Sequence, residues 1–139
     1  RALSVVAVDA RTGAEAVFDA GSGVALVDAV AASCAVPGVW PPVTIGGARY
    51  LDGGIRSMTN ADLARAYRRV LVVAPMDEPV VHEQLAALPG RAVLVTPDEE
   101  SLAAFGADVL DPAVRTPAAR AGRAQGAREA DRVGELWRG

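Results

Sequence analysis

The sequence has no lysine, one cysteine (Cys34) and one histidine (His82) among its 139 residues. A single cysteine excludes a disulfide bond within the chain, and one cysteine with one histidine cannot supply the usual four ligands of a zinc site. All 14 basic residues are arginine, and the formal charge of -3 shows none of the basic excess that nucleic-acid-binding proteins carry. We therefore expect no metal site and no nucleic-acid partner.

Long apolar runs are also missing, because none approaches the roughly 20 residues that a membrane-spanning helix needs. Hydrophobic residues nevertheless make up 51% of the chain and charged residues 22%, which is typical of a folded globular protein. A length of 139 residues favours one domain with a buried core. The first apolar run starts at Leu3, so we expect the chain to begin within a domain, and we expect a cytoplasmic location.

The N-terminal part predicts two strands followed by a helix. Residues 3–21 contain two β-rich runs joined by a turn at Thr12-Gly13, and the first run is apolar enough for the interior of a sheet. Residues 24–36 have the length and alanine content of a helix. Because this helix is apolar almost all round, we expect it to be buried.

The C-terminal part predicts helices alternating with strands. The expected elements are a helix over 61–69 capped by Asn60, a strand over 70–75, a helix over 82–90, a strand over 91–97, a helix to about Phe105 opened by a capping box at Thr96, and a last helix from Thr116. In the last helix, Gly122 and Gly126 indicate close helix packing. This alternation predicts an α/β fold with a mainly parallel sheet covered by helices.

Asp52 is the residue whose surroundings suggest chemistry. Residues 43–51 predict a hairpin with Gly46-Gly47 as its two-residue turn, which places Asp52 at the end of the returning strand. Asp52-Gly53 is itself a common turn sequence, so a structural role is one interpretation. A second glycine, Gly54, allows a sharp bend and keeps bulk away from the carboxylate, which favours an active-site corner.

The segment "AVAASCAVPGVWPPVTIGGARYLDGGIRSMTNADLA" resembles the C-terminal part of the patatin-like phospholipases, a family of serine lipid acyl hydrolases. The matching pieces are the A-A-S helix, the P-G corner, the P-P-V step, the hairpin and D-G-G followed by Asn. The resemblance implies that residues 1–139 are the C-terminal part of one three-layer patatin-like domain. It implies Asp52 as general base, with Gly53 and Gly54 as motif partners, and a lipid or ester substrate without a cofactor. Transient contact with a membrane surface also follows from the resemblance.

The family's nucleophile motif, G-x-S-x-G, is absent from the sequence, as is the glycine-rich oxyanion loop. Ser22 lies in the nearest approach to that motif, but its glycine spacing is wrong and it falls in a turn. We expect the nucleophile and the oxyanion loop upstream of Arg1, so that the 139-residue chain alone is inactive.

Two alternatives stay open. His82 follows Asp52 in the chain order of Ser-Asp-His α/β-hydrolases, although it opens a polar helical segment that is typical of a protein surface. A non-catalytic α/β interaction domain, in which D-G-G is only a turn, is the other alternative. Cys34 lies in an apolar helix without a nearby histidine, so we expect it to be packed rather than reactive.

Overall fold

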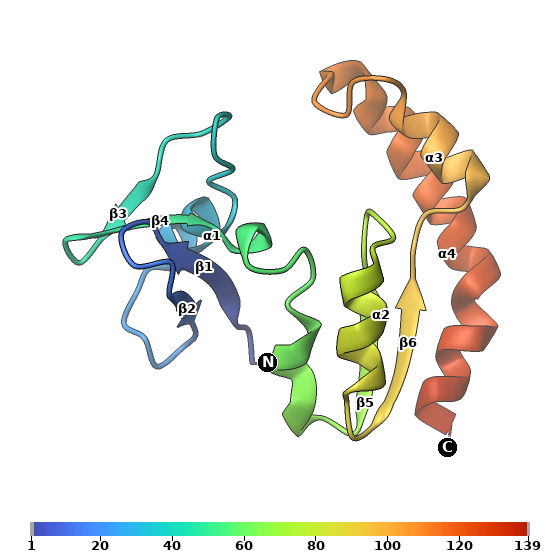
Figure 1. Cartoon of the computed structure of the whole chain (residues 1–139). Coiled ribbons are helices and arrows are strands. Elements are labelled where there is room, and N and C mark those ends of the chain that lie inside the picture. The colour runs from blue at the N-terminus through green and yellow to red at the C-terminus, as the bar shows by residue number, and fades with distance from the viewer. Residues whose placement is uncertain (1, 139) are drawn as a thin grey trace. The chain divides into compact units, whose positions relative to one another are not determined.

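The computed structural model describes residues 2–138, which divide into one unit that ends at Asn60 and a second that begins at Ala61. The first unit contains β1 (Val5–Asp9), β2 (Glu15–Phe18), α1 (Leu26–Ser33), β3 (Val43–Ile45), β4 (Ala48–Asp52) and the short 3-10 helix η1 (Gly53–Ile55). Its strands form one sheet in the order β2-β1-β4-β3, and α1 packs against β1 and β4 (Figure 1).

Every strand pair in this sheet is antiparallel, so the prediction of a mainly parallel sheet is wrong for the first unit. Tight turns join β1 to β2 and β3 to β4, and a tight turn can connect only antiparallel neighbours. The predicted Gly46-Gly47 turn is confirmed, with φ of 57° and 84° that suit glycine. At the other turn, the backbone N–H groups of Thr12 and then Arg11 donate to Asp9 and lower its pKa.

The core of the first unit is small and comes from β1, α1 and a residue just after α1. Its buried side chains are Ala7 and Val8 on β1, Ala29 and Ala32 on α1, and Ala35 just after α1. The prediction that β1 is an interior strand is confirmed.

The expectation of a fully buried helix over 24–36 is wrong. Helix α1 covers Leu26–Ser33, and Leu26, Val27 and Val30 are exposed on it. Cys34 is exposed as well, so the expected packing of this thiol is not found. An apolar sequence is compatible with burial of a helix on every side. It does not tell which side of the helix residues 2–138 cover and which side they leave exposed.

The second unit contains the predicted strand-helix-strand order. Its elements are η2 (Ala61–Ala66), β5 (Arg69–Val73), α2 (Pro79–Ala86), β6 (Arg91–Val95), α3 (Glu99–Phe105), η3 (Pro112–Val114) and α4 (Arg115–Arg138). Strands β5 and β6 are parallel, and α2 connects them. Helix α4 lies along β6 and packs against α3 (Figure 1).

One buried polar side chain joins α4 to the turn between β6 and α3. The Gln125 amide donates to the carbonyl of Thr96 over 2.6 Å and accepts from the Ser101 hydroxyl over 2.9 Å. The predicted capping box at Thr96 is displaced by two residues, because Asp98 is the N-cap and accepts the N–H of Ser101. The backbone N–H of Asp98 donates to the side-chain oxygen of Gln125 over 3.2 Å, which holds this later start of the helix.

The ion pair between Asp98 and Arg128 makes the second unit sensitive to acid. The Arg128 guanidinium, followed by the Ser101 N–H, lowers the pKa of Asp98 below its ordinary value of 3.8. A lowered folded-state pKa gives stability above the ordinary value, and this stability is lost as the pH falls through the folded-state value. We therefore expect Asp98→Asn to lower the urea midpoint of the second unit at pH 7.

The difference from the unchanged chain should shrink as the pH falls below 3.8. Urea unfolding followed through amide signals of β6 at pH 7 and pH 3 measures this. Glu83→Gln on the exposed side of α2 is the control, and it should change neither midpoint. A deficit of Asp98→Asn that is equal at both pH values would contradict the expectation.

Candidate active site around Asp52

Asp52 is the last residue of β4, as predicted, and two neighbouring segments fix its backbone. It lies opposite Ala7 of β1 in the antiparallel register. Its N–H donates to the carbonyl of Ala35, just after α1, over 3.1 Å. The carboxylate therefore starts from a backbone that is tied to the centre of the sheet and to the end of the helix.

Asp52-Gly53 does not form a hairpin turn, because β4 is followed directly by η1 and pairs only with β1 and β3 among the described strands. Asp52 is instead the N-cap of η1, and its Oδ1 accepts the N–H of Gly54 over 2.6 Å. A hydrogen bond from a backbone N–H to a carboxylate is short and strong, and it holds the carboxylate in one orientation.

The two glycines after Asp52 have different amounts of space around them, and neither has a positive φ. A Cβ on Gly53 would lie 2.5 Å from the carbonyl oxygen of Val6 on β1. A Cβ on Gly54 would lie 2.8 Å from Oδ1 of Asp52 itself. The first contact is with the backbone of β1, so a side chain at position 53 would push against the sheet. The second contact is with the Asp52 side chain, which can rotate, so a side chain at position 54 would displace only the carboxylate.

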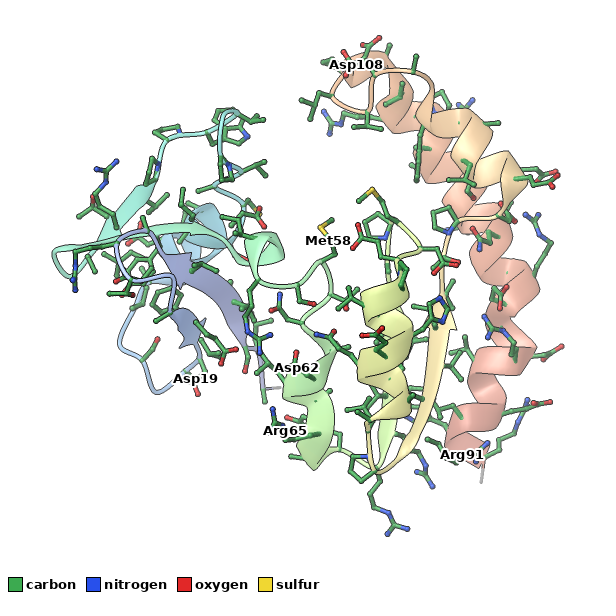
Figure 2. The ribbon with its side chains drawn as sticks, viewed as in Figure 1. Asp19, Met58, Asp62, Arg65, Arg91 and Asp108 are labelled. Atoms are coloured by element: carbon green, nitrogen blue, oxygen red, sulfur yellow. The ribbon has the colours of Figure 1, made fainter. Side chains whose placement is uncertain are left out.

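Asp52 is one of the residues that line a hollow of about 360 Å³ on the first unit. The hollow is lined by Ser4, Val5, Val6, Ser33, Asp52, Gly53, Gly54, Met58, Thr59 and Asn60. Met58, labelled in Figure 2, comes from the segment that follows η1. The sequence analysis did not identify the hydroxyl-bearing residues Ser4, Ser33 and Thr59 as part of the site, although Ser33 belongs to the quoted A-A-S helix.

Asn60 does not have the role that its sequence position suggested. Its side chain points back along the chain, where Nδ2 donates to the carbonyls of Gly53 (3.2 Å) and Ser57 (2.8 Å). The helix that it was predicted to cap is the short 3-10 helix η2. Asn60 has a φ of 49°, which is uncommon for a residue other than glycine.

The other sequence candidates lie elsewhere. Ser22 is in a turn, and its hydroxyl donates to the carbonyl of Asp19 over 2.7 Å. His82 is on α2 in the second unit, and its Nε2 lies 2.6 Å from Oδ1 of Asp77. Both members of this pair are more than half exposed, which confirms the prediction of a surface histidine.

The second unit has a larger hollow of about 470 Å³ between β5, β6, α3 and α4. Most residues of its lining are apolar, and Glu129 is the one ionisable residue among those that form it. The neutral polar groups of the lining are bonded to one another, because the Ser101 hydroxyl donates to Gln125 and the Gln125 amide donates to the Thr96 carbonyl. The carboxylate of Glu129 is paired with Arg132 over 2.6 Å. This hollow therefore lacks the groups that acid-base or nucleophilic chemistry requires.

Comparison with known families gives one match: the patatin-like phospholipase family model matches residues 2–65. The match covers a little under half of the chain and includes the hairpin, Asp52 and Asn60. It confirms the resemblance for this segment, which is therefore similar to a family of lipid hydrolases, and it ends before β5. No curated protein matches the chain. Within residues 2–138, no helix combines the length and the apolar character needed to cross a membrane.

Proposed function

We propose that this chain supplies the aspartate of a Ser-Asp dyad in a serine lipid acyl hydrolase. The observation that carries the proposal is that the Gly54 N–H holds the carboxylate of Asp52, a residue that lines a hollow. The segment around it is similar to patatin-like phospholipases. The substrate class is accordingly a lipid or another acyl ester.

In the proposed reaction, Asp52 accepts the proton of a serine hydroxyl while the serine oxygen attacks the acyl carbon. The ester bond breaks, the alcohol leaves with the proton, and an acyl-serine ester remains. Asp52 then accepts a proton from water as the water oxygen attacks this ester, which releases the fatty acid and restores the serine. A carboxylate is a weak base for this task, so its fixed orientation must contribute to the rate.

The nucleophile is proposed to come from outside the 139 residues, because the sequence has no G-x-S-x-G. We further propose that the chain forms the C-terminal part of one patatin-like domain, whose remaining part brings the serine and the oxyanion donors. Contact with a membrane surface during turnover and a cytoplasmic location belong to the same proposal.

A Ser-Asp-His hydrolase is the second candidate. The sequence order suggested Asp52 as its aspartate, but the carboxylate that contacts His82 in the structure is that of Asp77, and this pair is the observation that favours the candidate. The 2.6 Å contact has the form of the His-Asp half of a catalytic triad. Its two side chains are 59% and 58% exposed, whereas a triad aspartate is normally buried. The structure of the second unit therefore gives this candidate the weaker support.

A fluorophosphonate probe, which labels activated serines covalently, tests the proposal. We expect no labelling and no hydrolysis of a short-chain p-nitrophenyl ester with the 139-residue chain. A longer protein that adds a G-x-S-x-G segment should be labelled at that serine.

Heat-unfolded protein is the control for non-specific labelling. Labelling of a serine within residues 1–139, for instance Ser33 in the wall of the hollow, would overturn the proposed origin of the nucleophile. Ser33→Ala would then show whether this hydroxyl is the labelled one.

A further inference from the structure

We propose that Asn60 is a positioning residue for the Asp52 carboxylate and acts through the peptide group between Gly53 and Gly54. The carbonyl of Gly53 and the N–H of Gly54 belong to one planar trans peptide group, so they point in opposite directions. Asn60 Nδ2 donates to that carbonyl, and the N–H on the other side donates to Asp52 Oδ1. Fixing the carbonyl therefore aims the N–H at the carboxylate.

The orientation of this peptide group depends on the donors to its carbonyl, because glycine lies on both sides of it. Glycine has few steric limits on φ and ψ, so a Gly-Gly peptide can rotate more easily than any other. Val6 limits the movement of the Gly53 Cα through its close backbone contact, but that contact does not fix the plane of the following peptide. Within η1 the Gly53 carbonyl accepts the backbone N–H groups of Arg56 (3.2 Å) and Ser57 (3.4 Å). The Asn60 amide adds a side-chain donor to the same oxygen over 3.2 Å.

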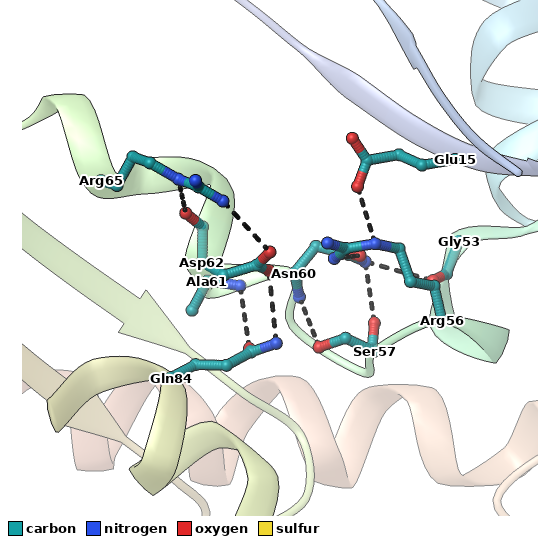
Figure 3. A network of polar contacts seen from close by, with 9 residues as sticks. All are labelled: Glu15, Gly53, Arg56, Ser57, Asn60, Ala61, Asp62, Arg65 and Gln84. Carbon is teal, nitrogen blue, oxygen red and sulfur yellow. Dashed lines mark hydrogen bonds and ion pairs between the residues drawn. The ribbon is translucent and has the colours of Figure 1, made fainter. Parts of the chain in front are cut away.

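Asn60 is itself held firmly (Figure 3). Its backbone N–H donates to the hydroxyl of buried Ser57 over 3.0 Å, and its Nδ2 donates to the Ser57 carbonyl over 2.8 Å. Its Oδ1 accepts from Arg56, whose Nε lies 2.6 Å from Oε2 of Glu15 on β2. Asn60 is thus connected to the edge strand of the same sheet that carries Asp52.

The backbone of Asn60 supports a specific need for its side chain. A φ of 49° is a conformation that glycine adopts freely and that most other residues adopt at a cost. Glycine would satisfy the backbone but has no amide, whereas asparagine tolerates the conformation and adds the two hydrogen bonds to Gly53 and Ser57.

These properties supply a matched pair of variants. Asn60→Gly keeps the left-handed backbone and removes the amide. Asn60→Asp keeps the shape of the side chain, but it replaces the donor to Gly53 with an oxygen that repels the carbonyl. Both variants should weaken the Gly54–Asp52 hydrogen bond, and neither imposes a new steric contact.

The first experiment needs no catalytic activity and uses NMR hydrogen exchange of the 139-residue chain. We expect the Gly54 amide to be protected in the unchanged chain and to lose at least about 10-fold of this protection in Asn60→Gly, the loss that would follow from an aimed hydrogen bond worth about 1.4 kcal/mol. The Thr12 amide, which donates to the Asp9 carboxylate in the same unit, is the internal control and should not change. Equal Gly54 protection in all variants would overturn the proposal.

The second experiment rests on the proposed function and measures ester hydrolysis by the longer protein. Asn60→Gly should lower kcat by about 10- to 100-fold with little change in KM, because a displaced catalytic group acts on the transition state more than on substrate binding. Adding Asn60→Gly to Asp52→Asn should lower kcat no further, since Asn60 acts only through Asp52. A further loss in the double variant would overturn the positioning role.

The two experiments separate the two ideas. Lost protection of Gly54 with unchanged kcat would support the positioning of Asp52 and would count against its catalytic role. Unchanged protection with lost kcat would overturn the positioning and leave the catalytic role of Asp52 supported.

Discussion

Asp52→Asn is expected to reduce ester hydrolysis by the longer protein by a factor on the order of 10² to 10⁴, the usual contribution of a general base. Asparagine keeps the shape of the side chain, and its amide oxygen can still accept the Gly54 N–H. It cannot take the serine proton. The loss should therefore lie in kcat, and the urea midpoint of the first unit should stay close to that of the unchanged protein.

His82→Ala is the comparison that separates the dyad from the triad. It removes the Asp77 contact on the exposed side of α2 and should leave hydrolysis nearly unchanged. An equal loss in both variants would replace the dyad with a Ser-Asp-His mechanism that uses Asp52 and His82, whereas a loss in His82→Ala alone would favour the His82–Asp77 pair. Full activity in both would return Asp52 to a structural role at the start of η1.

Gly53→Ala is expected to destabilise the first unit by about 1–3 kcal/mol, the usual cost of forcing an extra methyl group into a filled space. The new Cβ would meet the backbone of Val6 at 2.5 Å. Val6 lies on β1, which is paired on both sides, so the strand cannot move away without breaking the sheet. Urea unfolding followed through amide signals of β1 measures the loss.

Gly54→Ala is the matched control for Gly53→Ala. Its Cβ would meet the Asp52 carboxylate at 2.8 Å, and this side chain can rotate out of the way. We expect a much smaller change in the β1 unfolding midpoint, and β6 in the second unit should report no change for either variant. Equal destabilisation by the two alanines would contradict the distinction between the backbone contact and the side-chain contact.

The sequence predicts the surroundings of Asp52 best where glycine chemistry is local. Gly46-Gly47 requires positive φ at both positions, which determines the hairpin and hence the strand that ends at Asp52. Whether neighbouring strands run parallel or antiparallel depends less on local sequence. The strand-helix alternation after Asn60 correctly predicts the parallel pair β5–β6, but it does not extend to the first unit, where tight turns join the strands.

Features that depend on a distant partner could not be predicted. Asparagine is a residue type that often caps helices, and only the folded chain shows that the Asn60 amide turns back to the carbonyl of Gly53. In the same way, Asp98 replaces Thr96 as the cap of α3 because Gln125, 27 residues further along, accepts the N–H of Asp98. The apolar sequence of α1 gave no indication that Val27 would be exposed.

The boundary between the two units has a practical meaning for gene design. Asn60 is the last residue of the first unit, eight positions after the aspartate in the printed numbering. A truncation or gene fusion that stops just after the D-G-G codons would retain Asp52, Gly53 and Gly54. It would still remove Asn60, whose side chain donates to the Gly53 carbonyl. Library designs that exchange the C-terminal half should therefore place their crossover after codon 60, so that chimeras inherit the motif together with the side chain that orients it.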